Sequence, residues 1–493
     1  IIIGVGHHKT DIATRILNTM RQHQADLVAQ AICLAEELER VSFLWHEQWN
    51  AALQTASTLY FDSSDYVGMT ALLEPLYQLL DNPKTLHEVA FVQSFGPDLH
   101  NAAACLARSQ DARDIGAAWR YYHDVFLRIQ RMLPNLTLLN LNDVSPKLQR
   151  ANNLKLAVPG TYTPNRPLVR IVSFDSELLV IASKQRPRKL SLRGSDGRKF
   201  TYLLKAQEDL RVDERVMAFF GMVNQLMRQS KQRHREITRY SVTPLSENAG
   251  LIGWVPNCDT LHSLIIQYRK RKDIVAHAEH MHIRRAAPET KNNEGRPTDK
   301  GYDQLPSLHK IEVFENALRT TSGEDLSFML WYTSPDLERW LERRTAYTKS
   351  LAVMSMVGYI LGLGDRHPSN IMIDRVTGAI CHIDFGDCFE VAQHRTQYKE
   401  QVPFRLTRVL VNAFDLGGID GMFLSTCDKV MHLLRENNES LLAILELFVY
   451  DPLVDWRRNK RVHLPGDKCV NTLLDMGTAG TNTGTTGSNA SHI

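Results

Sequence analysis

The chain has 493 residues, 43% of them hydrophobic, which is enough for two or three domains that each bury a core. A net charge of +3 argues for neither nucleic acid nor a membrane surface as a partner. No apolar run approaches the ~20 residues of a membrane span, and seven scattered cysteines without a Cys-x-x-Cys pair favour a reducing compartment. Because the first residue is Ile1, we expect a fragment of a longer protein.

The N-terminal quarter of the chain has the apolar spacing of helices. Apolar residues recur at helical intervals over residues 11–61, which predicts two or more helices. Loop signals divide the next segment into predicted helices near 66–80, 85–108 and 112–132. With the helix that ends at Phe61, these three predict a four-helix bundle. Pro97 lies inside one of them and predicts a kink.

A different pattern follows Pro134. Short β-branched runs between Pro and Gly turns predict an antiparallel sheet, with strands over 168–172, 178–182, 189–192, 200–204 and 239–244. Helical patterns return from Thr260 to Trp456, interrupted by a polar loop over 288–306, and 477–491 is a Gly/Thr/Ser/Asn tract typical of a linker. The predicted fold class is therefore α+β, with an all-α four-helix bundle before a two-lobed, protein-kinase-like catalytic domain.

Two local clusters of basic residues stand out in a chain of balanced charge. One comprises Arg186, Arg188, Lys189 and Arg193, and the other spans Arg269 to Lys272. Charge runs of this kind usually form solvated faces, so we predict exposed side chains at both. Ser183 and Lys184 lie in the turn before the first cluster, where backbone N–H groups and these two side chains could bind phosphates.

The most specific signal is a pair of short motifs in the second helical region. Gly364 to Asn370 reads Gly-Asp-Arg-His-Pro-Ser-Asn, and His382 to Gly386 reads His-Ile-Asp-Phe-Gly. In protein kinases a catalytic Asp and a metal-binding Asn lie five residues apart on one loop, as Asp365 and Asn370 do. Asp384 follows fourteen residues later, placed to hold the metal that bridges the ATP phosphates. These motifs predict ATP-dependent phosphoryl transfer.

The surroundings of the loop fit that prediction. Residues 351–363 form an apolar helical stripe that leads into the loop, and 371–373 with 380–383 predict a β-hairpin after it. His367 lies two residues beyond Asp365, close enough to direct a hydrogen bond or partial charge at the transferring phosphoryl group. A structural role is the alternative for a lone histidine.

An upstream lysine completes the predicted ATP site. Lys205 ends a β-run, as expected of the lysine that binds ATP phosphates, and acidic residues predicted on the next helix could pair with it; Glu208 and Asp213 are both candidates. No Gly-x-Gly-x-x-Gly precedes Lys205. We therefore expect the turn with Ser183 and Lys184 to take the place of a glycine-rich loop.

The Asp-Arg-His order and the missing glycine-rich loop resemble the phosphoinositide 3-kinase superfamily. The segments Pro403–Arg408 and Phe448–Leu453 look like its protein-kinase branch, and Gly250–Pro256 looks like the hinge of the target-of-rapamycin (TOR) kinases. The resemblance implies a Ser/Thr protein kinase that regulates growth in response to nutrients. It implies ATP and Mg²⁺, or Mn²⁺, as cofactors, and a cytoplasmic location, peripheral on endomembranes in part.

The resemblance also implies roles for individual residues. Asp365, His367 and Lys205 are implied as catalytic, and Asn370 and Asp384 as metal ligands. The implied nucleotide contacts are Ser183, Lys184, Lys205, Glu208, Asp213, Tyr240, Ile252, Trp254, Val255, Met372 and Ile383. The implied domains are the end of a helical-repeat (FAT) region over 1–40, a rapamycin-binding (FRB) bundle over 41–135, an N-lobe over 150–255 and a C-lobe over 256–462. A flexible linker over 463–493 follows, and the family's C-terminal FATC domain is absent.

The bundle is implied to bind partners. Leu53, Ser57, Phe61, Trp119 and Phe126 match the family's groove for drug binding and substrate docking. Gly116, Arg120 and His123 stand where the family usually has Thr, Asp and Tyr, which counts against tight binding of a rapamycin–immunophilin complex. The loop over 288–306 lies where the family contacts a WD-repeat adaptor, so this partner and a scaffold subunit are expected.

Two other functions share these features. A lipid kinase has the same Asp-Arg-His loop, but usually carries a lysine-rich run after Asp-Phe-Gly, whereas Asp387–Arg395 has one Arg and two acids. A pseudokinase that serves as a scaffold would have lost catalytic residues, and none is missing. A protein substrate is therefore favoured.

Overall fold

The computed structural model describes residues 10–108, 112–230, 236–286, 290–291, 297–298, 305–389, 391–395 and 399–450. The predicted linkers over 463–493 and 477–491, and most of the predicted loop over 288–306, lie outside these residues. In the described part, no helix is long and apolar enough to cross a membrane.

The N-terminal region is helical as predicted. The helices are α2 (Thr10–Ser42), α3 (Trp45–Phe61), α4 (Tyr66–Leu80), α5 (Leu86–Arg108) and α6 (Ala112–Met132). Helices α3 to α6 share one apolar core that includes Trp49, Phe91, Phe95 and Tyr122, so the predicted four-helix bundle is confirmed. Helix α5 continues through Pro97, and the bend expected there stays a prediction.

The sheet that follows contains all five predicted strands and two more. Its strands are β1 (Leu138–Asn140), β2 (Ile171–Phe174), β3 (Glu177–Val180), β4 (Arg188–Gly194), β5 (Lys199–Ala206), β6 (Val242–Pro244) and β7 (Ala249–Gly253). Three short helices lie beside β1 in the chain: η1 (Leu133–Asn135), α7 (Leu141–Val144) and α8 (Pro146–Arg150). The order is β1-β3-β4-β5-β7-β6, with β2 also paired to β4, and the pairs are antiparallel. Only three residues long, β1 is too short for an alternating pattern to reveal.

Helix α9 (Arg211–Gln229) lies between β5 and β6 and belongs to the sheet lobe. The remaining elements form a mostly helical lobe. They are β8 (Cys258–Thr260), α10 (Leu261–Arg271), α11 (Ala278–Ala286), β9 (Thr290–Lys291), β10 (Pro297–Thr298), α12 (Ser307–Arg319), α13 (Asp325–Tyr332), α14 (Leu337–Leu361), β11 (Ile371–Asp374), β12 (Ile380–His382), η4 (Val391–His394), α15 (Arg408–Val411), η5 (Gly418–Asp420), α16 (Met422–Glu436) and α17 (Asn438–Tyr450). The predicted hairpin is β11–β12, and β8 adds a third strand to it.

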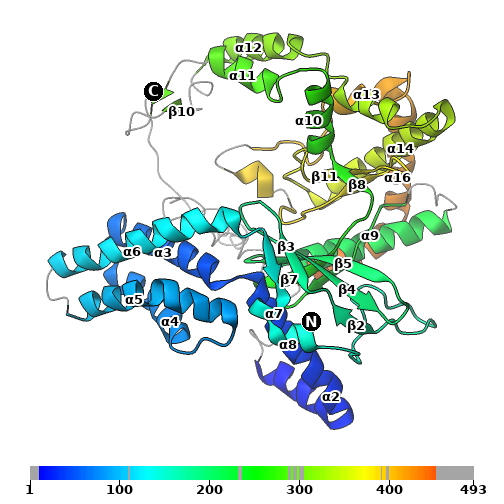
Figure 1. Ribbon diagram of the computed structural model, residues 1–493. Helices are drawn as coiled ribbons and strands as arrows, with labels where there is room; N and C mark the ends of the chain where they lie inside the picture. The colour runs from blue at the N-terminus through cyan, green and yellow to red at the C-terminus, as the bar shows by residue number, and fades with distance from the viewer. Residues whose placement is uncertain are drawn as a thin grey trace, which may run out of the picture.

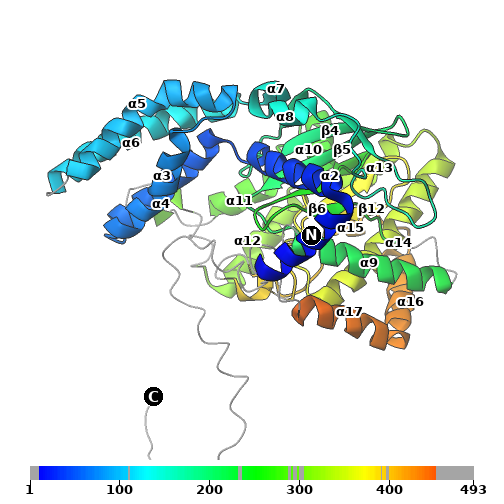
Figure 2. The same cartoon turned by 90° about the horizontal axis from the view of Figure 1, so that it is seen from below.

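The parts meet around the catalytic motifs. In Figure 1 the bundle lies beside the large sheet, and α10 to α14 lie above it with β8 and β11 between the two lobes. Figure 2 shows the bundle and α16 on opposite sides of the molecule. Helix α9, which follows the sheet strand β5, buries Val216 and Phe219 in the same core as Leu351 and Val357 of α14. One continuous core therefore joins the sheet lobe to the helix that leads into the catalytic loop.

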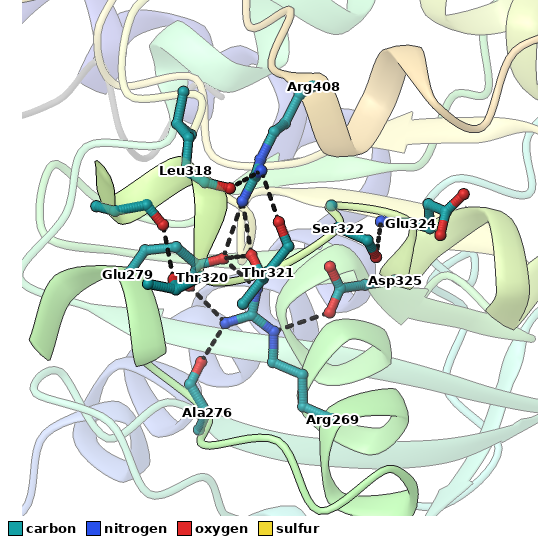
Figure 3. A network of polar contacts seen from close by, with 12 residues as sticks. Arg269, Ala276, Glu279, Leu318, Thr320, Thr321, Ser322, Glu324, Asp325 and Arg408 are labelled. Carbon is teal, nitrogen blue, oxygen red and sulfur yellow. Dashed lines mark hydrogen bonds and ion pairs between the residues drawn. The ribbon is translucent and has the colours of Figure 1, made fainter. Parts of the chain in front are cut away.

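The second basic cluster is exposed as we predicted from Lys270 to Lys272, but Arg269 is buried. Arg269 is 5% exposed; its Nε donates to Asp325 Oδ1 at 2.8 Å and its guanidinium also donates to Glu279 Oε1 at 2.6 Å. Arg408 on α15 joins this network through Thr321 and Glu279 (Figure 3). Burial acts to raise the pKa of Glu279, but hydrogen bonds from Arg269 and Thr321 lower it to about 2. Arg269 is buried because its carboxylate partners come from neighbouring helices, Glu279 from α11 and Asp325 from α13.

Candidate active site

The catalytic loop begins where α14 ends. Gly362 ends the helix in the left-handed conformation, at φ +57°, which a glycine adopts without strain. Asp365 follows at φ +59°, a conformation that is costly for a residue with a side chain. The Asn370 side chain donates from Nδ2 to the Asp365 carbonyl at 3.0 Å and to Asp365 Oδ2 at 3.3 Å. The structure thus brings the predicted base and the predicted metal ligand into contact.

Arg366 fixes this loop to the segment around Asp384, a role that the sequence analysis missed. The side chain is 3% exposed. Its Nε donates to the Gly364 carbonyl at 2.8 Å, and its two terminal nitrogens donate to the carbonyls of Ile383 and Asp384. Five donors in a rigid plane suit a guanidinium to this task. The Arg between Asp365 and His367 was a visible signal, but no pattern indicated that it points inward.

His367 lies at the open side of the loop. Its Nδ1 accepts a hydrogen bond from the Ser369 N–H at 3.2 Å, so the neutral ring carries its proton on Nε2. Nε2 lies 3.9 Å from Asp365 Oδ2, and about half of the side chain is exposed. The Nε2–H of His367 therefore lies near the predicted base, where it could donate a hydrogen bond to a bound group.

Lys205 lies in a buried group of carboxylates. Its Nζ lies 3.0 Å from both carboxylate oxygens of Glu208. Burial acts to lower the pKa of Lys205, but the charges of Asp384, Glu208 and Asp213 outweigh it and raise that pKa above its ordinary value. Lys205 therefore stays protonated and places a positive charge near Asp384. Glu208 lies in the turn before α9 rather than on the helix as predicted, because the chain must leave β5 before it can turn into a helix.

Asp213 occupies the first turn of α9 and is almost fully buried. Its Oδ1 accepts a hydrogen bond from the Phe385 N–H at 3.1 Å, which joins the lysine group to the Asp-Phe-Gly segment. Burial raises the pKa of Asp213, Lys205 opposes this, and the neighbouring carboxylates add to it, so that the pKa is about 7. Of the two candidates, Glu208 pairs directly with Lys205, while Asp213 connects α9 to Phe385.

The predicted adenine contacts lie on or beside β6, β7 and the hairpin β11–β12. Ile252 is buried on β7, and Trp254 follows it, 43% exposed, with Lys189 Nζ 4.1 Å from its ring centre. Met372 on β11 pairs with Thr260 of β8, so the strand after the hinge adjoins the catalytic hairpin. The other predicted contacts in this region, Tyr240, Val255 and Ile383, are partly buried. Their roles stay predictions.

The turn between β3 and β4 carries the predicted phosphate contacts. Ser183 and Lys184 are exposed there, as a ligand contact requires. Arg193 of the first basic cluster is exposed as we predicted, but Arg186 and Arg188 are not. The side chain of Arg188 is 1% exposed and that of Arg186 is 17% exposed, and both contact Glu47 of α3. The prediction was wrong at these two arginines because their partner lies in another domain, 139 residues away from Arg186.

The sequence analysis also missed a contact to the backbone of Asp365, the predicted catalytic base. Both oxygens of Glu400 accept the Asp365 N–H, at 3.0 and 3.1 Å. Arg395 pairs closely with Asp387 and lies 3.8 Å from Asp365 Oδ1 and 4.0 Å from Glu400 Oε1. The segment after Gly386 therefore supports Asp365 from below. Without an alignment, nothing in this polar stretch marks Glu400 as a partner of a residue 35 positions earlier.

The residues of the predicted groove lie on α3 and α6. Phe61 is 62% exposed, and its ring centre lies 5.2 Å from that of Trp119. Leu53 is buried, while Ser57 and Phe126 are partly buried. Gly116 is exposed, and a Cβ added there would meet no atom within 4 Å. The glycine is therefore not required by packing.

The donor atoms fit a divalent cation shared with a nucleotide. Asn370 and Asp384 would supply oxygen ligands, which hard cations such as Mg²⁺ prefer, and nucleotide phosphates usually complete such a site. The described residues contain no group of three or more His, Cys, Asp or Glu that could hold a metal alone. Among these residues, the Asp384 carboxylate accepts no hydrogen bond that would compete with a cation.

Comparisons with known proteins agree with this geometry. A family model described as phosphatidylinositol 3- and 4-kinase matches residues 199–458, and one described as FKBP12-rapamycin binding domain matches 37–131. The chain is 51% identical over 456 residues to the serine/threonine-protein kinase mTor of Drosophila melanogaster, covering 91% of this chain and 18% of that protein. It is 50% identical over 453 residues to the serine/threonine-protein kinase TOR of Oryza sativa subsp. japonica, with 90% and 18% coverage.

A solved structure of a kinase domain also matches this chain. The structure titled FAT and kinase domain of CtTel1 matches with a TM-score of 0.50 and 26% sequence identity, covering 86% of this chain and 28% of that chain. The chain spans about a fifth of the length of the curated relatives that it matches, at 18% for both relatives above.

Proposed function

This chain belongs to the phosphatidylinositol 3- and 4-kinase family, and we propose that it is the catalytic part of a TOR-type Ser/Thr protein kinase that regulates growth. It transfers the γ-phosphate of ATP to protein hydroxyl groups. The observation that carries this proposal is the contact of Asp365 with Asn370 on one loop, beside Asp384 and Lys205. Identities of about 50% to kinases named TOR support the choice of substrate class.

The residues divide the reaction between them. The oxygen of the acceptor hydroxyl forms a bond to the γ-phosphorus while Asp365 accepts the hydroxyl proton. The bond between the γ-phosphorus and the ADP oxygen breaks. Lys205 binds the phosphates with a charge that its carboxylate neighbours keep in place. The Nε2–H of His367 donates toward the phosphoryl oxygens, where negative charge develops. Mg²⁺, held by Asn370 and Asp384, would neutralise the phosphate charge when bound.

A protein substrate is favoured over a lipid by the segment after Gly386. Recognition of a phosphoinositide headgroup requires free cationic side chains near the acceptor site. Arg395 is the one Lys or Arg in the segment Asp387–Arg395. It pairs with Asp387 and lies close to Asp365 and Glu400. Its charge is therefore already balanced by carboxylates.

The test is a comparison of acceptors. The chain is incubated with radiolabelled ATP and Mg²⁺, once with Ser/Thr peptides and once with phosphatidylinositol vesicles. We expect label in the peptide. Transfer to lipid alone would replace this proposal with the lipid-kinase alternative, and binding of ATP without transfer to either acceptor would favour the pseudokinase scaffold.

We also propose that a WD-repeat adaptor binds at the pair α11–α12, at the edge of the helical lobe in Figure 1. Large apolar side chains are exposed on and beside these helices: Val275, Met281, Leu308, Ile311 and Phe314, with Leu308 80% exposed. Such a surface is unusual unless a partner covers it. Leu308→Asp should abolish co-purification of an adaptor identified by mass spectrometry, while Leu79→Asp on α4 should not. Equal recovery with both variants would contradict this assignment.

The bundle is proposed to dock protein substrates in the groove beside Phe61. The match to an FKBP12-rapamycin binding domain supports a binding role for this surface. Tight binding of the drug complex is not proposed, because Gly116, Arg120 and His123 replace the side chains expected there. A cytoplasmic location is in keeping with the described cysteines, which are all free thiols.

A further inference from the structure

The turn between β3 and β4 is held from outside its own lobe. Kinases place a strand–turn–strand over the ATP phosphates, and the position of that turn decides how well the phosphates are bound. Here Arg186 Nε donates to Glu47 Oε1 at 3.0 Å, and its terminal nitrogen donates to the Leu136 carbonyl at 2.8 Å. Glu47 lies in the first turn of α3, which belongs to the four-helix bundle.

A second arginine makes the contact a buried cluster. The Arg188 guanidinium donates to Glu47 Oε2 and to the carbonyl of Arg186. Glu47 Oε2 also accepts the Leu44 N–H at 3.0 Å, which caps the start of α3. The Glu47 carboxylate therefore joins the bundle's first helix to two residues of the turn, with side chains that are 7% exposed for Glu47 and 1% for Arg188.

The contact also holds a residue of the turn in a strained backbone conformation, beside the turn's own hydrogen bond from the Arg186 N–H to the Ser183 carbonyl at 3.2 Å. Arg186 is at φ +48°, in the left-handed region that a residue with a Cβ adopts only when its surroundings impose it. The two hydrogen bonds from its side chain run to the bundle and to the segment just after it. Without them the turn would relax toward ordinary conformations, and Ser183 and Lys184 would lose their fixed positions.

We propose that Glu47 is a positioning residue for the ATP phosphates: through Arg186 and Arg188, the four-helix bundle holds the phosphate-binding turn in place. This inference rests on the proposed kinase function, because it assigns the turn a nucleotide. Glu47 does not touch ATP and acts only through the two arginines.

A purely structural contact would behave differently. If the cluster only fastened the bundle to the sheet, its loss would lower the unfolding temperature and leave nucleotide affinity unchanged in the molecules that remain folded. If it positions the turn, its loss weakens ATP binding, whereas the rate at saturating ATP changes little, because the catalytic loop is held by other residues. The division between KM for ATP and kcat therefore separates the two roles.

The experiment uses the full 493-residue chain and two variants of the cluster. Glu47→Gln keeps the side-chain shape and removes the charge, and Arg186→Gln removes one donor group whose side chain is partly exposed. Arg193→Gln, at an exposed position on the same strand β4, is the matched control for the arginine variant, and Glu74→Gln on the exposed face of α4 is the control for Glu47. Peptide phosphorylation gives KM for ATP and kcat, and a fluorescent ATP analogue gives nucleotide affinity without turnover.

We expect KM for ATP and the dissociation constant of the analogue to rise about tenfold in both variants, with kcat within about threefold of the wild type. Unchanged nucleotide affinity in a folded variant would overturn the inference. If Glu47→Gln does not fold, Arg186→Gln alone decides the question. A wild-type chain that neither binds nor uses nucleotide would instead refute the proposed function, so the two failures are distinguishable.

Discussion

The turn between β3 and β4 and the predicted catalytic loop each hold a strained residue in place, but the contacts that hold it come from different parts of the chain. Each contains a residue held at positive φ, Arg186 at +48° and Asp365 at +59°, and each is fixed by arginine and carboxylate contacts. Asp365 is supported by Glu400, 35 residues away and in the same lobe, whereas the turn depends on Glu47, more than 130 residues before it and in another domain. The predicted catalytic loop is therefore held by a contact within its own lobe, while the turn between β3 and β4 is held by a contact to the bundle.

The comparison implies that chemistry and nucleotide affinity can be changed separately, and Asp384→Asn gives the largest test. The substitution keeps the shape of the side chain but weakens the metal ligand where phosphate charge develops. We expect turnover of the peptide to fall by ~10² or more. The control is Asp196→Asn in the exposed turn between β4 and β5. An unchanged rate would mean that the metal site is misassigned.

Asp213 gives a test at the joint between the two regions, because it connects α9 to Phe385. Its pKa is about 7 in the folded chain and 3.8 ordinarily. The folded state thus retains a proton that the unfolded chain loses, and the stability from this group falls as pH rises from about 4 to 7. Between pH 5 and pH 8, we expect the wild type to lose roughly 2 kcal/mol of unfolding free energy relative to Asp213→Asn.

Urea unfolding of the nucleotide-free chain, followed by tryptophan fluorescence at each pH, measures this difference. Asp428→Asn, at an exposed position on α16, should show the same pH dependence as the wild type. Parallel curves for the wild type and Asp213→Asn would show that Asp213 is ionised throughout. The joint would then be an ordinary ion pair with Lys205.

Glu400 provides the counterpart to Glu47. Glu400→Ala leaves the Asp365 N–H without its acceptor and frees a residue that is held at positive φ. We expect kcat to fall roughly tenfold, since a hydrogen bond to a charged group contributes about 1.5–3 kcal/mol, while KM for ATP stays within about twofold. Glu400→Gln retains an acceptor and should restore much of the rate. A rise in KM for ATP with kcat intact would remove the contrast with the phosphate turn.

Much of this molecule follows from local sequence patterns. The helices of the bundle were predicted within one residue at 66–80, 85–108 and 112–132, because apolar spacing and loop residues act over short distances. The five-residue interval from Asp365 to Asn370 likewise predicted that one loop carries both residues, and the structure adds the contact between their side chains. The family resemblance is confirmed by the matches to both domains.

The contacts that position the site were decided by tertiary structure. Arg188 and Arg269 belong to basic runs that usually face solvent, and their burial depends on carboxylates brought from other elements. Asp213 meets Phe385 across 172 residues. Local patterns cannot report such pairs, because a charge run has the same appearance whether or not a distant carboxylate packs against it. The sequence by itself determined the chemistry of the loop, and the packing of the bundle and the two lobes decided what holds that chemistry in place.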